Sequence, residues 1–327
     1  MNMPLLERTF SQKDGVSPKD IEHLFDPQKT PTWELIEQAR QVREQTVGNQ
    51  AHLCMILNAK SGACSEDCAF CSQSIHHSCN VAVYPMVTKD VALKEARKAE
   101  EAGIRCFGLV TSGREIKHEG EKKQILEMIA FLRGNTGLEV GLSPGLADLP
   151  FLRELKEAGL STFHHNLETA PSFYEKICTT HLFEQRLRTV YEAKEAGLRV
   201  CSGGIFGLGE SLVHRAELAM LWKKLPIDRI PVNFLNPVPG TMLEKQEKLK
   251  PIEALHTLAA LRKLIPDKEI LVCGGRDAIL KSLQPFLFSA GADGIMTGNY
   301  LTTPGNGVAE DQAILEDLNL SWHQADS

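Results

Sequence analysis

The residues of this chain best suited to chemistry are three cysteines within eight positions, Cys64, Cys68 and Cys71. Their C-x3-C-x2-C spacing lets one loop bind three irons of a cubane iron–sulfur cluster, and the lack of a fourth clustered cysteine leaves one iron open to a small ligand. An open iron indicates catalysis. The alternative is a zinc site, whose fourth ligand could be His76, His77 or Cys79. Zinc sites usually contain two C-x2-C motifs, whereas this loop has only one.

The cysteine loop follows the first of eight short apolar runs that we predict as β-strands. These are His52–Leu57, Arg105–Val110, Leu138–Leu142, Thr162–Asn166, Arg199–Ile205, Arg229–Phe234, Ile270–Cys273 and Gly294–Thr297. Between them, amphipathic stretches with apolar residues near i, i+3, i+4 and i+7 predict helices. These are Asp90–Ala102, Glu121–Arg133, Phe151–Ala158, Phe183–Ala196, Leu212–Lys223, Ile252–Leu264 and Ala278–Ala290.

This alternation favours an α/β fold of the (β/α)8 TIM-type barrel class. Four predicted helices end on Ala-Gly, where a glycine in a left-handed conformation lets the chain turn into the next strand. We predict an N-terminal extension over residues 1–50, with a helix at Trp33–Glu44, a barrel domain over residues 51–320 and a C-terminal tail over residues 321–327. A barrel places its functional loops at the carboxyl ends of the strands, which is where the cysteine loop falls.

Composition narrows the function classes. The 327 residues carry a formal net charge of -6 and a sequence pI near 6.0, so we expect neither a nucleic acid nor a membrane as partner. Residues 1–8 lack the pattern of a signal peptide, and no stretch approaches the length of apolar sequence that spans a bilayer. We therefore expect a cytoplasmic protein. Its nine cysteines then indicate metal or redox chemistry rather than disulfides.

Phe70 stands directly before the last loop cysteine, so the loop reads C-x3-C-x-Φ-C with an aromatic Φ. This motif resembles the signature of the radical S-adenosylmethionine (SAM) enzymes. In that family the open iron binds the amino and carboxylate groups of SAM, and one electron passed to the sulfonium releases a 5′-deoxyadenosyl radical. The resemblance implies a 4Fe–4S cluster on Cys64, Cys68 and Cys71, and SAM as a cofactor.

A second element of the same family lies at residues 203–210, which resemble a G-x-I-x-G-x-x-E motif at the end of the fifth strand. In these enzymes the motif lies beside the adenine of SAM, which implies that Gly203, Gly204 and Ile205 contact the cofactor. Independently of the family, glycines there would let the backbone approach a flat ligand closely. A structural turn is the alternative.

Six further stretches resemble motifs of the biotin synthase family in order, from about residue 50 to residue 320. They are residues 62–68, 165–169, 177–180, 200–205, 231–234 and 300–304. The resemblance implies insertion of sulfur into dethiobiotin to form biotin, an external electron donor such as flavodoxin or ferredoxin, and a homodimer.

By the same resemblance, Asn166, Glu168 and Arg186 would hold the ribose and the carboxylate of SAM. Glu168 stands where the family more often has aspartate, which keeps two acceptor oxygens but changes their reach by one methylene. Taken alone, Asn166 and Glu168 could instead cap a helix. Arg186, in a predicted helix, could form an exposed ion pair.

For the substrate, the resemblance implies that Asn233 bonds the ureido ring of dethiobiotin and that Thr302 and Thr303 lie near its carboxylate. His164 stands where the family usually has asparagine, so a polar contact of the substrate differs here.

The family also carries an auxiliary iron–sulfur cluster, usually 2Fe–2S, that serves as the sulfur source. Three cysteines and an arginine usually hold it. Matching the strands residue by residue places these ligands at Gly108, Gly141, Cys201 and Leu271. Only Cys201 can bind iron through its side chain, so the usual cluster cannot form.

Two other cysteines, Cys106 and Cys273, each lie two positions from a matched site and therefore share its strand face. We hypothesise that Cys106, Cys201 and Cys273 hold a different auxiliary cluster. The equal alternative is that they are buried core residues. Cys54, Cys79 and Cys178 have no assigned role, and we expect core packing or a loop thiol.

The predicted function is thus that of a radical SAM sulfurtransferase, a biotin synthase. One alternative is a related enzyme without sulfur insertion, of the hydrogenase-maturation or methylornithine-forming type, which the missing auxiliary ligands favour. The other is a non-catalytic zinc-binding scaffold built on the Cys64 loop.

Overall fold

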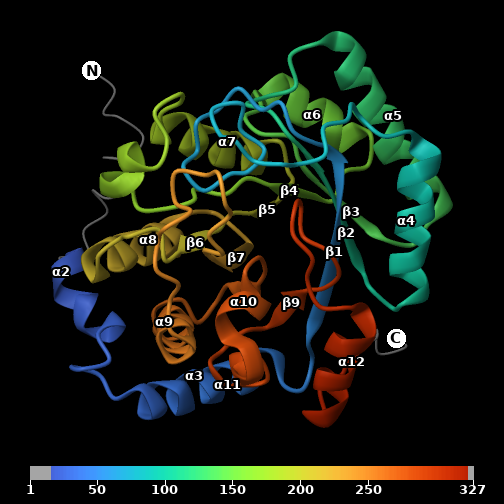
Figure 1. Ribbon diagram of the computed structural model, residues 1–327. Coiled ribbons are helices and arrows are strands. Elements are labelled where there is room, and N and C mark those ends of the chain that lie inside the picture. The colour runs from blue at the N-terminus through green and yellow to red at the C-terminus, as the bar shows by residue number, and fades with distance from the viewer. Residues whose placement is uncertain (1–15, 323–327) are drawn as a thin grey trace.

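The computed structural model describes residues 16–322, in which parallel strands form a closed barrel (Figure 1). The strands are β1 (His52–Lys60), β2 (Cys106–Thr111), β3 (Glu139–Ser143), β4 (Thr162–His164), β5 (Arg199–Cys201), β6 (Gly204–Phe206), β7 (Arg229–Phe234), β8 (Glu269–Val272) and β9 (Gly294–Met296). They pair in the order β5-β4-β3-β2-β1-β9-β8-β7-β6, and a pairing of Cys201 with Arg229 closes the sheet. Because β5 and β6 share one barrel position, the predicted (β/α)8 fold is confirmed.

The predicted strand Arg199–Ile205 is interrupted at Ser202 and Gly203, and the structure corrects it to β5 and β6. The backbone of β7 approaches closely here, since a Cβ at Gly203 would lie 1.8 Å from the carbonyl oxygen of Pro231. Ser202 still donates its backbone N–H to Arg229 at 2.9 Å. The glycine therefore permits a local change of strand pairing.

Six of the seven predicted barrel helices are confirmed to within two residues at each end. They are α4 (Lys89–Glu101), α5 (Glu119–Asn135), α6 (Leu149–Glu157), α7 (Phe183–Glu195), α8 (Leu212–Lys224) and α9 (Pro251–Leu264). The glycines after four predicted helices, Gly103, Gly159, Gly197 and Gly291, all have positive φ, as their capping role requires.

The predicted helix Ala278–Ala290 is wrong as a single element. The structure breaks it into α10 (Arg276–Leu280), η3 (Lys281–Leu283) and α11 (Phe286–Ser289). Lys281 has a φ of +52°, and Pro285 has no N–H to continue a helical ladder. A further helix, α12 (Val308–Asp317), lies beyond the predicted set.

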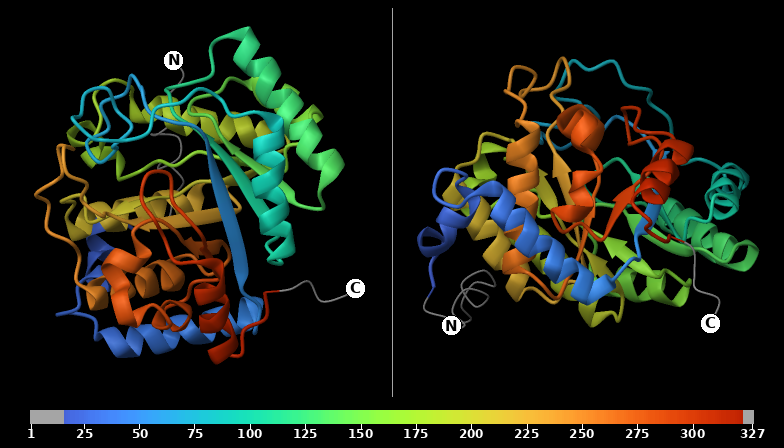
Figure 2. Two further views of the ribbon diagram at one scale, coloured as in Figure 1. Left: turned by 45° about the vertical axis from the view of Figure 1, so that its right-hand side comes forward. Right: turned by 90° about the horizontal axis from the view of Figure 1, so that it is seen from below.

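The N-terminal part contains α2 (Pro18–Ile21), η1 (Glu22–Phe25) and α3 (Thr32–Val47), so the predicted helix at Trp33–Glu44 is confirmed. Arg43 of α3 donates to the carbonyl oxygens of Ala292 and Gln50, just before β9 and β1. The helix therefore lies at the amino end of the barrel, opposite the cysteine loop (Figure 2). Residues 1–15 and 323–327, with most of the predicted tail, lie outside the described residues.

Across residues 16–322, no helix combines the length and the apolar character needed to cross a bilayer.

Candidate active site

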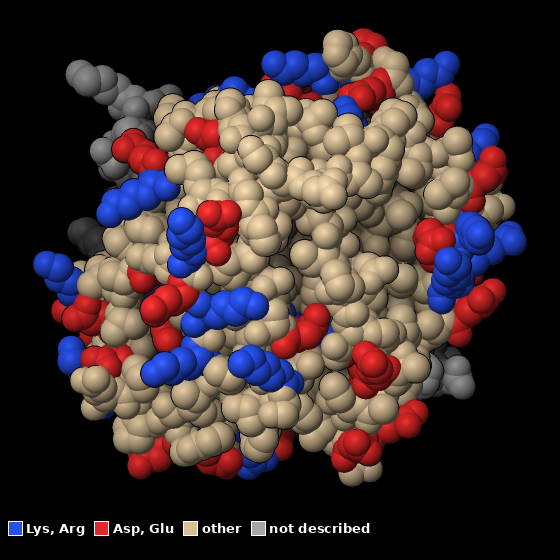
Figure 3. All heavy atoms as spheres, viewed as in Figure 1, with Lys and Arg blue, Asp and Glu red and all other residues tan. Residues whose placement is uncertain are grey.

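A cavity of about 320 Å³ opens at the carboxyl ends of the strands. Three loops line it, with residues 70–73, residues 235, 236 and 238, and residues 300–303, and in Figure 1 the segments that carry them lie around the open end of the barrel. The same view drawn as spheres shows charged side chains mainly around the periphery and an uncharged, hollowed centre (Figure 3). The barrel thus offers a largely uncharged site at its functional end.

The cysteine loop, residues 61–78, is folded back on itself by backbone hydrogen bonds. Cys64 donates to Gln73 at 3.0 Å, and Ile75 donates back to Cys64 at 2.9 Å. Cys71 and the neighbouring Phe70 line the cavity, while Cys68 is buried behind them. Burial raises the pKa of the Cys71 thiol to about 11 and also raises that of Cys64. A bound metal centre would therefore be needed to keep these ligands ionised.

The donor set fits an iron–sulfur cluster better than one zinc ion on the Cys64 loop. The sulfurs of Cys64, Cys68 and Cys71 do not form a group within 4.8 Å of one another among the described residues. A cubane binds each thiolate to a separate iron and so holds them farther apart than one tetrahedral ion does. The three proposed fourth zinc ligands contact backbone carbonyls instead: His76 that of Ser65, His77 that of Cys71 and Cys79 that of Pro239.

The three residues expected to bind SAM lie together. Arg186 donates through Nη1 to the carbonyl oxygen of Asn166 at 2.8 Å and lies 3.6 Å from the carboxylate of Glu168. The Arg186 side chain is only 13% exposed, so it does not form the exposed ion pair considered from sequence. Asn166 and Glu168 line the cavity.

One carboxylate oxygen of Glu168 is free to accept a hydrogen bond from a ligand. Oε2 of Glu168 is enclosed and has no hydrogen-bond partner in residues 16–322. Glu168 also has a φ of +68°, an uncommon conformation for a side chain other than glycine. Burial raises the pKa of its carboxyl, with the Arg186 charge opposing. An unpaired buried acceptor suits the hydroxyls of a ribose, so these residues fit SAM.

The glycine motif has a packing role in addition to any contact with a ligand. A Cβ at Gly204 would lie 2.6 Å from the carbonyl oxygen of Glu168, so this glycine lets the segment carrying Glu168 approach β6. Ile205 lines the cavity, whereas Gly203 and Gly204 are not among its lining residues.

The expected substrate residues line the same cavity and come from different elements. Asn233, the last residue but one of β7, hydrogen-bonds the backbone on both sides: it donates to the carbonyl oxygen of Gly204 at 3.2 Å and accepts the N–H of Gly274 at 2.8 Å. Thr302 and Thr303 also line the cavity. The Thr302 hydroxyl is 2.8 Å from that of Ser72, which directly follows the last loop cysteine.

Deeper in the barrel, four buried cysteines line this cavity: Cys54, Cys106, Cys201 and Cys273. Cys54 and Cys106 are register partners on β1 and β2, and Cys273 follows β8. The structure brings together the three thiols grouped from sequence and adds Cys54, for which we had expected core packing. Cys54 lies beside Cys106 because β1 pairs with β2, and without this pairing its place among the thiols could not have been predicted.

Three of the family's four usual auxiliary-ligand positions, Gly108, Gly141 and Leu271, carry no donor, and the structure shows which side chains lie nearby. A Cβ at Gly141 would lie 2.5 Å from Nε2 of His164, so the imidazole fills that space. Nε2 itself has no hydrogen-bond partner among the described residues. Arg229 on β7 brings its Nη1 to 3.9 Å from the sulfur of Cys106. The family usually has arginine at the position of Leu271 on β8. Here Arg229 supplies a guanidinium from β7, the strand that pairs with β8.

Arg229 is held in place by an ion pair with Glu269, which also contacts His52. We expect this network to stabilise the fold in a way that depends on pH. Burial by itself raises the pKa of Glu269, but its hydrogen bond with His52 and the charge of Arg229 outweigh it and lower the pKa to about 2. This stabilisation is present above about pH 4.5 and is lost as the pH falls through about 2. A shift of this size corresponds to about 3 kcal/mol.

We expect Glu269→Gln in the cluster-free chain to lower the free energy of unfolding at pH 7 by about 3 kcal/mol, because Arg229 loses its buried partner. Urea titrations between pH 7 and pH 3 measure the difference from wild type, which should shrink as the solution is acidified. Glu139→Gln, which removes a more exposed ion pair with Arg199, is the control and should cost less than about 1 kcal/mol. A difference independent of pH would contradict this assignment.

The comparisons agree with this geometry. The pattern described as the Radical SAM superfamily matches residues 59–221, and that of the Biotin and Thiamin Synthesis associated domain matches residues 231–321. The crystal structure of methylornithine synthase superposes with a TM-score of 0.81 at 19% identity, covering 97% of this chain and 96% of that one. An FeFe-hydrogenase maturase from Carboxydothermus hydrogenoformans gives the same TM-score at 19% identity, covering 98% and 80%. Fold and cysteine loop together define a radical SAM enzyme.

Sequence relatives narrow the class further. The chain is 48% identical to a biotin synthase from Citrifermentans bemidjiense over 91% of this chain and 90% of the relative. It is 47% identical to one from Geotalea uraniireducens, with 86% of each chain covered, and 42% identical to one from Geotalea daltonii, with 98% of each covered. The chain belongs to the biotin synthase family.

This membership decides between the functions left open by the sequence. The chain is a radical SAM sulfurtransferase that acts on dethiobiotin and uses a 4Fe–4S cluster, SAM and an auxiliary iron–sulfur cluster. Neither the related enzymes without sulfur insertion nor a zinc-binding scaffold is favoured, since the likeness to methylornithine synthase and the maturase extends to the fold alone.

Proposed function

We propose that this chain converts dethiobiotin to biotin with its two iron–sulfur centres placed at the two ends of one cavity. The observation that carries this proposal is that Cys71 of the cysteine loop and the four interior thiols line the same cavity, together with Asn233. Cys64, Cys68 and Cys71 hold the 4Fe–4S cluster. Cluster and SAM together supply, when bound, the radical chemistry that activates the C–H bonds of the substrate.

The residues around SAM orient it and exclude water. Asn166, Glu168 and Arg186 bind its ribose and carboxylate, with the buried Arg186 held by the carbonyl oxygen of Asn166. Phe70 and Ile205 line the cavity beside the SAM pocket, and Gly203 and Gly204 let β6 approach the segment that carries Glu168. The largely uncharged walls protect reactive species from solvent.

We expect Glu168→Gln to raise KM for SAM by about 10- to 100-fold with a smaller effect on kcat, because the buried Oε2 acceptor is replaced by an amide. Initial rates of 5′-deoxyadenosine formation at varied SAM measure this, and Glu168→Asp should retain more affinity than Glu168→Gln. Glu195→Gln, at an exposed position of α7, is the matched control. An unchanged KM in Glu168→Gln would remove Glu168 from the SAM site.

The substrate lies between the two centres. Asn233 is fixed by backbone on both sides, so its amide is oriented before the ureido ring binds. Thr302 and Thr303 hold the carboxylate. The hydroxyl contact between Thr302 and Ser72 joins the loop that carries Thr302 and Thr303 to the cysteine loop. This contact keeps the substrate in a fixed position relative to the 4Fe–4S cluster.

Cys201, with Cys106 and Cys273, holds the auxiliary cluster, 2Fe–2S or a variant, that donates sulfur. Cys54 adds a fourth thiol, and Arg229 places a positive charge beside Cys106. Burial raises the pKa of Cys106 to about 12, so ionised thiolates here require compensating positive charge from a bound centre and from Arg229. The donor set therefore fits an iron–sulfur centre.

The remaining assignments rest on the family and on composition. The electron comes from an external donor such as flavodoxin or ferredoxin, and the chain forms a homodimer. Nine free thiols suit a reducing compartment, which supports a cytoplasmic location. Residues 51–320 form the barrel domain, residues 1–50 an N-terminal extension and residues 321–327 a tail.

Incubation of the reduced enzyme with SAM and dethiobiotin tests the function directly. We expect both 5′-deoxyadenosine and biotin. Formation of 5′-deoxyadenosine without biotin, in protein that holds both clusters, would contradict the proposed sulfur insertion.

A further inference from the structure

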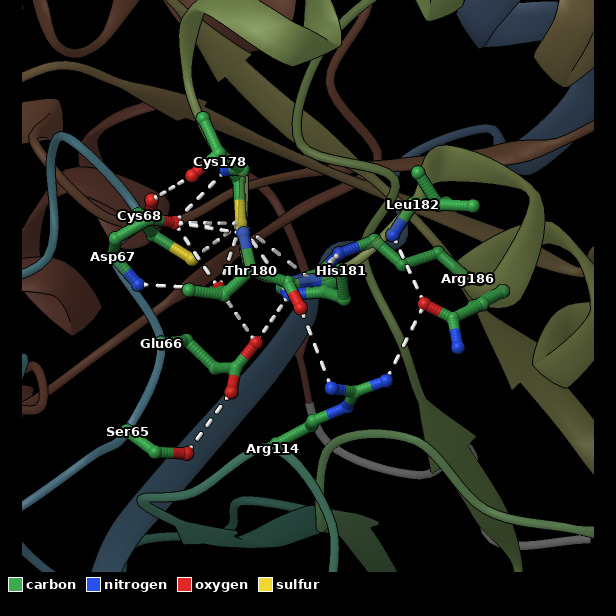
Figure 4. Close-up of polar contacts among 12 residues, drawn as sticks. Ser65, Glu66, Asp67, Cys68, Arg114, Cys178, Thr180, His181, Leu182 and Arg186 are labelled. Carbon is green, nitrogen blue, oxygen red and sulfur yellow. Dashed lines mark hydrogen bonds and ion pairs between the residues drawn. The ribbon is translucent and has the colours of Figure 1, made fainter.

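Beside the cysteine loop lies a second group of metal-binding side chains, two of which, Cys178 and His181, have no role in the proposed reaction. Cys68, Cys178 and His181 are all buried, and one ligand atom from each lies within 4.8 Å of the other two. Figure 4 shows these side chains converging, with the segment that contains Cys178 and His181 packed against the cysteine loop. Cys178 and His181 come from the connection between η2 (Pro171–Lys176) and α7.

The spacing of these atoms matches a tetrahedral site. The sulfurs of Cys68 and Cys178 are 3.8 Å apart, and the Cys178 sulfur is 3.3 Å from Nδ1 of His181. A tetrahedral zinc ion, with bonds of about 2.3 Å to sulfur and about 2.0 Å to nitrogen, would set these separations at about 3.8 Å and about 3.5 Å. The ligands therefore need little rearrangement to bind one ion.

A carboxylate hydrogen-bonds the ring nitrogen that would bind the ion, but it does not belong to the group of three ligands. Oε2 of Glu66 is 2.5 Å from Nδ1 of His181, and its residue is buried. On the other side of the ring, Nε2 of His181 is 2.8 Å from the hydroxyl of Tyr174. With Nδ1 on a metal, Nε2–H would donate to this hydroxyl, the kind of outer contact that orients a histidine ligand. In the structure, Nε of Arg186 donates to Nε2 at 2.9 Å and to the Tyr174 oxygen at 2.7 Å, so metal binding at Nδ1 would leave Arg186 with the Tyr174 bond alone.

The backbone around the group is fixed before any ion binds. Asp67 accepts the backbone N–H groups of Thr179 and Thr180 at 2.9 and 3.2 Å, and Ala69 donates to the carbonyl oxygen of Ile177 at 2.8 Å. These bonds join the cysteine loop to residues 177–180. A site whose ligands are already held together loses less entropy when it binds an ion.

We propose that the cluster-free chain binds one thiophilic divalent cation in tetrahedral geometry through Cys68, Cys178 and His181, with a water molecule as the fourth ligand. This site differs from a zinc site on the Cys64 loop, because neither Cys64 nor Cys71 belongs to it. Cys68 is shared with the 4Fe–4S cluster, so the ion and the cluster compete for one thiolate. This competition rests on the proposed role of Cys68, whereas the cation site rests on the geometry alone.

Cobalt(II) titration of the full-length, cluster-free chain under anaerobic conditions tests the site. We expect one Co²⁺ per chain, with the thiolate charge-transfer and tetrahedral ligand-field absorption of cysteine-bound cobalt, and displacement by Zn²⁺. Cys178→Ser should weaken Co²⁺ binding by at least about 100-fold, more than the loss of an outer contact. His181→Gln gives a second test if Cys178→Ser does not fold, as judged by circular dichroism. Weak octahedral absorption in wild type, or unchanged affinity in folded variants, would overturn the proposal.

Two matched variants separate this site from the cluster. Cys64→Ala should bind Co²⁺ as wild type does but fail to assemble a 4Fe–4S cluster, while Cys178→Ser should assemble the cluster but fail to bind Co²⁺. Zn²⁺ should slow cluster assembly in wild type and not in Cys178→Ser. If Cys64→Ala still assembled the cluster, the proposed cluster ligands would be wrong while the cation site stood. If Cys64→Ala lost Co²⁺ binding, the cation site would be wrong.

Discussion

Cys64→Ala is expected to abolish the formation of both 5′-deoxyadenosine and biotin. The variant removes one of the three thiolates of the cysteine loop, and no other thiol of residues 16–322 stands in the loop to replace it at the same spacing. Without the cluster, SAM receives no electron, and only the uncatalysed reaction remains. We therefore expect a loss of more than about 1000-fold in the rate of 5′-deoxyadenosine formation.

Anaerobic assays with quantified iron and sulfide measure this effect and its cause together. Cys79→Ala is the matched control, because Cys79 follows the same loop but donates to the carbonyl oxygen of Pro239. It should keep wild-type iron and activity. Substantial 5′-deoxyadenosine formation by Cys64→Ala would show that the radical centre is held elsewhere.

Cys201→Ala is expected to separate the two products. Cys201 is 1% exposed and lines the deep part of the cavity with Cys54, Cys106 and Cys273, away from the cysteine loop. Its loss should remove the auxiliary centre while leaving the SAM site intact. We expect biotin to fall by more than about 100-fold while SAM is still cleaved to 5′-deoxyadenosine, since only the sulfur source is lost.

Iron content distinguishes a lost centre from a misfolded protein. Cys201→Ala should retain the iron of one cubane, about four atoms per chain, with a barrel that unfolds cooperatively. The same assay on Cys54→Ala tests whether the fourth thiol is a ligand, which would lower iron as Cys201→Ala does. Full biotin formation and wild-type iron in Cys201→Ala would rule out the rearranged auxiliary centre.

The barrel and the radical chemistry could be read from sequence because their signals are local. Helical periodicity and Ala-Gly endings lie within about 15 residues of sequence, and six helices were predicted to within two residues. The cysteine loop needs only eight residues. The broken helix also has a local cause that competes with periodicity, namely Lys281 and Pro285. The interruption of the fifth strand has a non-local cause, the close approach of Pro231 to Gly203.

By itself, the sequence determined the fold class and the cysteine loop, and it led to the hypothesis that Cys106, Cys201 and Cys273 form one set. Only the tertiary structure placed Cys54 and Arg229 in that set, filled the space beside Gly141 with His164, and brought Cys178 and His181 to Cys68. The physical reason is that alternation along a strand fixes which face a side chain takes, whereas its neighbours depend on strand register and on where each loop folds back. Register and loop packing arise from contacts between residues far apart in the chain.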